Sequence, residues 1–291
     1  MTAFIDAAAA ADGSRRLFRC KSPIKCVIQS IWGIPILFLA VELPDGTRAK
    51  AAGKRLALLD TALRERGVRR LLFSDRFPYK EFFISKGYGQ PGDTLLYEAV
   101  AWKIAGLFSG EGRSIAILAE KLTARRMKDI EALCRGYRYV LTDVGAGGFQ
   151  DHLQKTIGVS VIGRPNQRRL READVALFLD PPDEPVAFDR NTTVIANEGF
   201  HNVSAFSSVS GLTLKLRPRR GICVDTGGLR PEPLIELALE AGILSPGDIE
   251  VLEADTCPAD DKSAAVGPSR LLTKPKYSTI INKLIIEESD S

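Results

Sequence analysis

The chain has 291 residues, of which 45% are hydrophobic and 26% are charged. These proportions are typical of a soluble globular protein, and they exclude collagen-like, disordered and membrane-embedded chains. The net charge of +4 is mildly basic. Because the lysines and arginines are interspersed with acidic residues, a nucleic-acid-associated protein is the weakest of the functional interpretations.

Location and cysteine chemistry follow from three simple observations. The longest apolar segment, residues 31–41, is about half as long as the roughly 20 residues that a membrane-spanning helix needs. The N-terminal residues lack the pattern of a signal peptide, and the five cysteines contain no Cys-x-x-Cys pair. We therefore expect a cytoplasmic protein with free thiols and no zinc site.

The first 66 residues predict a small β-rich segment followed by a helix. Residues 1 to about 22 show no regular pattern, and we expect them to be loosely ordered. Residues 25–50 alternate between apolar and polar types and contain the turn sequence Pro44-Asp45-Gly46, which predicts a β-hairpin or meander. Leucines at three- and four-residue spacing then predict a helix over residues 54–66.

From residue 68 onward, short apolar strands alternate with amphipathic helices. The predicted strands are Arg70–Ser74, Ser114–Ala119, Arg138–Thr142, Val159–Gly163, Val175–Leu179 and Thr192–Ala196. The predicted helices between them are Tyr79–Lys86, Thr94–Phe108, Thr123–Arg135, Phe149–Thr156 and Gln167–Glu172. This alternation indicates an α/β fold, with a mostly parallel, doubly wound Rossmann-like sheet that carries helices on both faces.

The pattern sets the domain boundaries that we expect. The Rossmann-like α/β domain covers residues 67–198, after the β-rich segment of residues 1–66. A C-terminal α/β extension covers residues 199–255, with a helix over residues 233–241 that begins at a proline and ends at Gly242. Residues 256–291 form a tail.

Polar residues follow most of the predicted strands. Ligands of open parallel sheets bind beyond the carboxyl ends of the strands, so these residues are candidates for one cleft. They are Asp75, Glu120, Asp143, Arg164 and Asp180. A magnesium ion held by the three aspartates of this set is an alternative that the sequence leaves open.

The most specific segment is a strand that runs into Gly145, Gly147 and Gly148 before a helix. Glycines at such a turn let a phosphate approach the backbone N–H groups at the N-terminus of the helix. Residues 138–180 resemble the first βαβ unit of a Rossmann-type dinucleotide-binding domain, and are weakly similar to the NADP domain of the shikimate dehydrogenase family. The chain departs from the family pattern at Gln150, which stands where a third glycine is usual, and after residue 179, where Asp180 is followed by two prolines.

The resemblance implies a bound dinucleotide at the carboxyl edge of the sheet, with Gly145, Gly147 and Gly148 at its pyrophosphate and Asp180 nearby. Arg164 follows the second strand of the unit, where an arginine accommodates the 2′-phosphate of NADP and an acidic residue would hold the ribose of NAD. The implied cofactor is NADP, and the implied class is an oxidoreductase. The alternative is that the chain binds no cofactor.

The sequence contains no complete catalytic signature. Of its two histidines, His201 lies in a predicted loop close to Glu198, and these two residues are weak candidates for general acid–base work. Whether the protein is an enzyme therefore stays open. The other interpretation is a non-catalytic, regulatory or scaffolding Rossmann-like protein, and either protein could form a homo-oligomer.

Overall fold

The computed structural model describes residues 1–8, 24–42, 49–74, 77–92, 94–142, 147–163, 166–197, 200, 202–204, 207–217, 229–258 and 281–286. Contacts within the chain divide it into two compact units. Unit 1 comprises Met1–Asp93 and Arg219–Leu244, and unit 2 comprises Thr94–Pro218 and Ser245–Ser291. Within the described residues, no helix is both long enough and apolar enough to cross a membrane.

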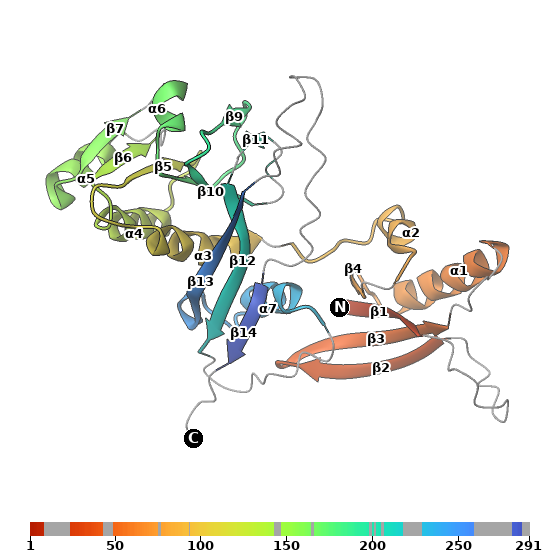
Figure 1. Cartoon of the computed structure of the whole chain (residues 1–291). Helices are drawn as coiled ribbons and strands as arrows, with labels where there is room; N and C mark the ends of the chain where they lie inside the picture. The colour runs from red at the N-terminus through yellow and green to blue at the C-terminus, as the bar shows by residue number, and fades with distance from the viewer. Residues whose placement is uncertain are drawn as a thin grey trace. The chain divides into compact units, whose positions relative to one another are not determined.

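Unit 1 is built on a four-stranded sheet in the order β2-β3-β1-β4 (Figure 1). Its elements are β1 (Thr2–Ala8), β2 (Ile24–Ile31), β3 (Ile34–Glu42), α1 (Ala49–Glu65), β4 (Arg70–Phe73), α2 (Lys80–Ile84) and α7 (Pro231–Glu240). The antiparallel pair β2 and β3 confirms the predicted hairpin. Its turn lies at Trp32 and Gly33, which both have positive φ as a tight two-residue turn requires, whereas residues 44–46 are outside the described residues.

Two expectations for this part of the chain were wrong. Of the N-terminal residues that we expected to be loosely ordered, Thr2–Ala8 form β1, which pairs in parallel with both β3 and β4 inside the sheet, and residues 9–22 lie outside the described residues. The predicted strand over residues 70–74 is present as β4, but it belongs to this sheet and not to the larger parallel sheet. An apolar run predicts a strand but not its pairing partners, because those are set by contacts distant in sequence.

Unit 2 contains an eight-stranded sheet whose continuous order is β13-β12-β10-β8-β5-β6-β7, with β14 paired to β12 (Figure 1). Its strands are β5 (Ser114–Leu118), β6 (Tyr139–Thr142), β7 (Ser160–Gly163), β8 (Val175–Phe178), β10 (Thr193–Ile195), β12 (Ser207–Leu216), β13 (Ile249–Pro258) and β14 (Ile281–Ile286). The strands from β7 to β12 are parallel to their neighbours, and β13 is antiparallel to β12. Numbered along the chain from β5, the parallel part has the order 3-2-1-4-5-6, which is that of a Rossmann fold. This confirms the predicted fold class.

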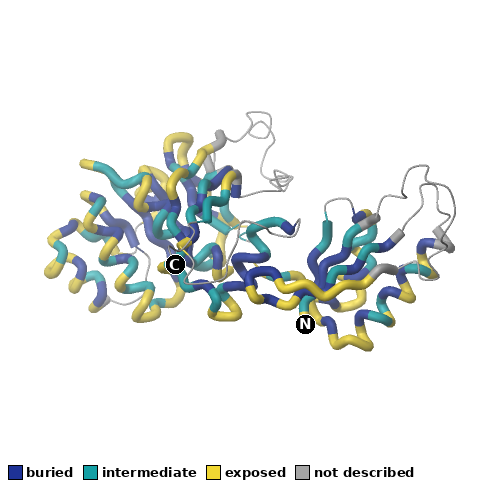
Figure 2. Tube along the Cα trace, turned by 90° about the horizontal axis from the view of Figure 1, so that it is seen from below, coloured by how far each residue is buried: buried dark blue, intermediate teal, exposed yellow. Residues whose placement is uncertain are grey.

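Helices and short strands cover the two faces of this sheet. They are α3 (Thr94–Leu107), α4 (Ala124–Cys134), α5 (Gly147–Ile157), α6 (Gln167–Arg171), β9 (Val186–Ala187) and β11 (Val203–Ser204). Figure 1 shows α3, α4 and α5 on one face, and α6 with β9 and β11 on the other. Alternate strand residues pack on the second face, where Leu118 and Phe178 join Leu170 of α6 and Val186 of β9 in one core cluster. Buried residues accordingly follow the strands in Figure 2, and exposed residues lie on the outer turns of the helices.

The register aligns the ends of neighbouring strands, which positions the candidate site. Leu118, the last residue of β5, pairs with Phe178, the last residue of β8. Thr142 at the end of β6 pairs with Gly163 at the end of β7. Because these strands are parallel, the segments that follow them leave the sheet at the same edge.

The two cysteines whose side chains are described differ sharply in environment. Cys26 is exposed and Cys134 is buried. Burial, assisted by the nearby Glu131 carboxylate, raises the pKa of the Cys134 thiol to about 12. Because the thiolate is the reactive form, we expect iodoacetamide at pH 8 to modify Cys26 at least about 100-fold faster than Cys134 in the native protein. Mass spectrometry of timed digests measures both rates, and similar rates would contradict this burial.

Candidate functional site

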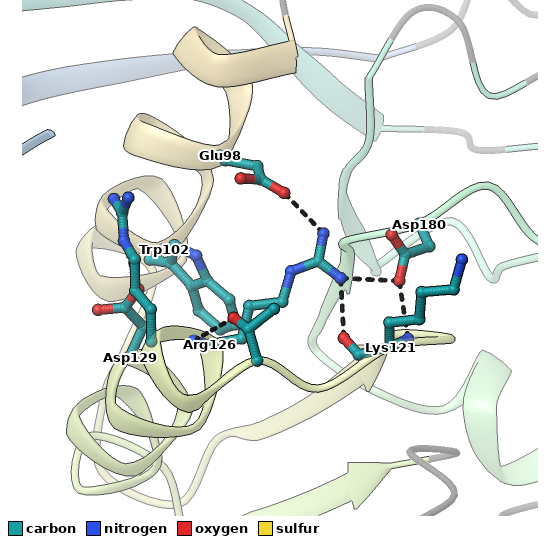
Figure 3. A pocket seen from close by; sticks show the side chains of 8 residues that line it. Glu98, Trp102, Lys121, Arg126, Asp129 and Asp180 are labelled. Carbon is teal, nitrogen blue, oxygen red and sulfur yellow. Dashed lines mark hydrogen bonds and ion pairs between the residues drawn. The ribbon is translucent and has the colours of Figure 1, made fainter. Parts of the chain in front are cut away.

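A small pocket lies where the strand order of unit 2 reverses, beyond the carboxyl ends of β5 and β8. It has a volume of about 200 Å³. Figure 3 shows the residues that line it, which are Glu98, Trp102, Lys121, Thr123, Arg125, Arg126, Asp129 and Asp180. They come from α3, from the turn between β5 and α4, and from α4 itself, and Asp180 is the second residue after β8. This is the position at which open α/β sheets bind ligands.

Arg126 organises the pocket from the first turn of α4. Its guanidinium donates to Asp180 Oδ2 at 2.8 Å and to Glu98 Oε1 at 2.7 Å, so the two carboxylates approach it from two sides (Figure 3). It also donates to the carbonyl oxygens of Lys121 at 2.9 Å and Leu179 at 3.3 Å. Burial opposes the charge, but the bonds to the two carboxylates outweigh it and raise the pKa of Arg126.

Asp180 connects the ends of β5 and β8. Its Oδ2 atom accepts the backbone N–H of Glu120 at 2.9 Å and that of Lys121 at 3.2 Å, in addition to the Arg126 guanidinium. Desolvation raises the pKa of this carboxyl, but the bonds from Arg126 and the two backbone groups outweigh it, and the pKa lies below its usual value. Asp180 therefore carries a negative charge that is held in place where the segments after β5 and β8 meet.

The turn between β5 and α4 contains no glycine. Its sequence, residues 119–123, is Ala-Glu-Lys-Leu-Thr, and Thr123 caps α4 by accepting the backbone N–H of Arg126 at 3.2 Å. In a Rossmann fold this first βα turn normally carries the glycines that cradle the pyrophosphate. Here the Asp180 carboxylate occupies the backbone N–H groups of Glu120 and Lys121 instead.

The outer wall of the pocket is mixed in character. Trp102 provides half-buried aromatic surface, and the Arg125 guanidinium lies 3.8 Å from the Asp129 carboxylate, with both side chains partly exposed. A second hollow of about 570 Å³ shares Glu98, Trp102, Arg125 and Asp129 with the pocket, and continues between α3 and α4. The arrangement can bind a ligand that has both polar and planar apolar parts.

Lys103 lines this second hollow. Its ammonium group donates to the carbonyl oxygen of Pro246 at 2.6 Å and to that of Ile249. Burial lowers the pKa of Lys103. The side chain thus joins α3 to the 3₁₀ turn η1 (Pro246–Asp248), and we assign it a structural role.

The structure brings together only part of the predicted set. Glu120 and Asp180 meet at the ends of β5 and β8, but only through the backbone N–H of Glu120, whose side chain is exposed, whereas Asp180 lines the pocket. Gly147 and Gly148 begin α5. The other predicted site residues, Asp75, Asp143, Gly145, Arg164, Glu198 and His201, lie outside the described residues.

Two consequences of this placement correct the expectations. Asp75 follows β4, whose sheet belongs to unit 1, so it does not follow a strand of the parallel sheet with the other candidates. The glycine turn follows β6 and not β5, so it lies in the second βα unit of the sheet and not in the first.

Within the described part of the chain, no group of three or more His, Cys, Asp or Glu side chains is placed to hold a metal ion.

Gln150, which departs from the family pattern, is accommodated by a glycine on the neighbouring strand. A Cβ atom at Gly163 would overlap the Gln150 side chain. The missing side chain at Gly163 thus leaves room for α5 to pack on β7, which is the role usually assigned to a third glycine in the helix.

Sequence reasoning missed Arg126 and Glu98. Their contact joins residues 28 positions apart, and the contact of Arg126 with Asp180 joins residues 54 apart. Thr123 was predicted as the start of its helix, which was the available local signal for this part of the site. Only the tertiary fold shows that the arginine one turn later is largely buried and bonded to two carboxylates.

Comparison with known proteins gives limited information. No protein-family model matches the chain, and no curated protein matches its sequence. The chain is weakly similar to a few solved structures of different enzymes. Quinate dehydrogenase from Corynebacterium glutamicum in complex with NAD is 15% identical, with a TM-score of 0.25, over 66% of this chain and 78% of that one.

Two further solved structures cover a smaller share of their own chains. The Δ1-pyrroline-2-carboxylate reductase of Thermococcus litoralis, in complex with NADH and L-proline, is 13% identical, with a TM-score of 0.23, over 76% of this chain and 63% of that one. The L-tryptophan dehydrogenase of Nostoc punctiforme is 11% identical, with a TM-score of 0.23, over 73% and 59%. At these values the assignment of a Rossmann-like fold rests on the strand order of this chain.

Proposed function

We propose that unit 2 binds a dinucleotide at the carboxyl edge of its parallel sheet. The observation that carries the proposal is the strand order β7-β6-β5-β8-β10-β12, which places a reversal point between β5 and β8 with a polar pocket beyond it. Open α/β sheets with this order bind their ligands in the crevice at that point.

We further propose that the dinucleotide is NADP. Gly145, Gly147 and Gly148 precede or begin α5, an 11-residue helix whose N-terminal N–H groups favour a pyrophosphate. Arg164 directly follows Gly163, whose register partner Thr142 ends β6 immediately before the glycine segment. The two segments thus leave neighbouring, aligned strand ends, which is compatible with one ligand that contacts both.

The activity that fits this cofactor is that of an oxidoreductase in the cytoplasm. An NADP-dependent enzyme transfers a hydride between the nicotinamide ring and a small substrate. In this proposal Asp180 and Arg126 hold the loops that follow β8 and β5, and they keep the crevice in shape. His201 and Glu198 remain the candidates for proton transfer.

One observation favours a second candidate function, that of a non-catalytic Rossmann-like regulatory or scaffolding protein. The first βα turn has no glycine, and the backbone N–H groups of Glu120 and Lys121 are already bonded to Asp180. A dinucleotide therefore cannot use this turn as a pyrophosphate cradle unless Asp180 is displaced. The second function requires that neither nicotinamide cofactor binds.

Calorimetric titration with NADP and NAD tests the proposal. We expect NADP to bind more tightly than NAD, and Arg164→Ala to weaken NADP by roughly 1.5–3 kcal/mol, the range for a charge-assisted hydrogen bond, with little effect on NAD. Arg168→Ala is the matched control, because Arg168 is highly exposed on α6 and pairs with Glu172, the residue that caps the C-terminus of this helix. Equal affinity for both cofactors overturns the NADP assignment, and no heat with either one favours the second function.

A further inference from the structure

The strand β2 forms an edge of the sheet in unit 1, and no described strand pairs with its outer side (Figure 1). Five successive residues in its middle, Cys26 to Ser30, are exposed. Val27 is 54% exposed and Ile28 is 64% exposed, although both are large apolar residues. A long edge strand with unpaired backbone groups and exposed apolar side chains is a template for another strand.

The exposed residues of β2 lie next to apolar residues of β3 on both faces of the sheet. Ile28 pairs with Leu37 and Cys26 pairs with Leu39, and both of these leucines belong to the core cluster that includes Leu56 of α1. Val27 pairs with Phe38, whose ring packs edge-to-face on Phe4 at 5.4 Å. An added strand would therefore extend an apolar layer on both faces of the sheet.

We propose that two copies of this chain associate through antiparallel pairing of their β2 strands, so that their sheets become one continuous sheet. A second copy fits because an isologous contact needs only one self-complementary strand. The two-fold axis of such a pair is perpendicular to the sheet, so a given residue points to the same face of the sheet in both copies. Residues opposite each other in a sheet must also share a face, so the axis lies between a residue and its own copy, and not between two successive residues.

The sequence of β2 selects the register of this pair. An axis at Val27 places Val27 opposite its own copy and Cys26 opposite Ile28, so all three central pairs are apolar. An axis at Ile28 instead places Val27 opposite Gln29 and Cys26 opposite Ser30. Because apolar cross-strand pairs stabilise a sheet more than pairs of an apolar with a polar residue, we place the axis at Val27.

Sedimentation equilibrium of the full chain tests the association. We expect a monomer–dimer equilibrium, and Val27→Glu to raise the dissociation constant at least about tenfold, because it places two carboxylates opposite each other at the axis. Leu58→Glu is the matched control, since Leu58 is 58% exposed, close to the 54% of Val27, but belongs to the helix α1 and not to the edge strand, and it should leave the equilibrium unchanged. A wild-type chain that stays monomeric at all concentrations, or a Val27→Glu chain with the dissociation constant of the wild type, overturns the proposal.

Directed crosslinking tests the register independently of stability. In a Cys26→Ser background, Val27→Cys should form an intermolecular disulfide under mild oxidation, because directly opposed Cα atoms in antiparallel strands are about 4.5–5.5 Å apart, within disulfide range. Ile28→Cys in the same background should crosslink at least about tenfold more slowly, because in the proposed register position 28 lies opposite position 26 and not opposite its own copy. Faster crosslinking at Ile28 would overturn this register.

Discussion

Replacement of Arg126 by alanine will lower the free energy of unfolding of unit 2 by about 3 kcal/mol. The side chain is 12% exposed, and that of its partner Asp180 is 19% exposed, so the substitution leaves a largely buried carboxylate without its counter-charge. The lost ion pair with Glu98 contributes less to this change, because the Glu98 side chain is 36% exposed and water screens its charge. The loss comes mainly from Asp180, which keeps its two backbone hydrogen bonds but loses its counter-charge.

Urea unfolding monitored by fluorescence measures this loss. The chain has two tryptophans, and in a Trp32→Phe background Trp102 reports on unit 2 alone. Arg125→Ala is the matched control. The Arg125 side chain is 56% exposed, and its guanidinium lies 3.8 Å from the Asp129 carboxylate, so the two form a weak surface ion pair. If the two alanine variants unfold at the same urea concentration, the buried ion pair does not stabilise the crevice.

The pH dependence of the wild-type stability follows from the same contacts. The pKa of Asp180 is lower in the folded chain than its ordinary value of 3.8. The stabilisation is therefore fully present above about pH 5 and is lost as the pH falls through the folded pKa. Asp180→Asn removes this contribution, so its stability should fall less steeply than that of the wild type below pH 4.

Replacement of Phe178 by alanine will destabilise unit 2 by about 3–5 kcal/mol, which is the range for deletion of a buried aromatic ring. Phe178 is fully buried at the end of β8, and its ring meets that of Phe188 edge-to-face at 5.6 Å. Its backbone carbonyl also accepts the hydroxyl of Tyr97, so the residue fixes the strand end that carries Asp180.

The same unfolding measurement applies, with Tyr139→Ala as the control. Tyr139 is an aromatic residue of β6 in the same sheet, but it is 40% exposed, and its loss should cost less than about 1 kcal/mol. The loss of stability caused by Phe178→Leu should lie between those of Phe178→Ala and Tyr139→Ala, because leucine leaves a smaller cavity than alanine. An equal effect of the Phe178 and Tyr139 substitutions would mean that the core is not packed as described.

The local pattern of the sequence predicted the elements of unit 2 well. Short apolar runs separated by amphipathic helices predicted β5, β6, β7, β8 and β10 close to their observed bounds. A strand buried on both faces is recognisable because nearly every residue in it must be apolar, as in β8. The parallel arrangement followed from the intervening helices.

What the sequence could not predict depends on long-range pairing. The strand β1 is alanine-rich, so its own sequence favours a strand only weakly, and it is stable because β3 and β4 flank it. The strands β13 and β14 were missed because β12 pairs them across long separations in the chain. The ion pairs of Arg126 were missed for the same reason, since neither partner is close in sequence.

Hydrogen exchange with and without NADP tests most directly whether the carboxyl edge of the unit 2 sheet is a dinucleotide site. We predict that NADP slows the exchange of peptides that contain residues 143–150 and 164–168, and that peptides from β13 in the same sheet exchange at an unchanged rate. The amides of Glu120 and Lys121 should change little, because Asp180 already accepts them. Unchanged exchange across all of these peptides at saturating NADP, or slowing confined to β13, would contradict the proposed site.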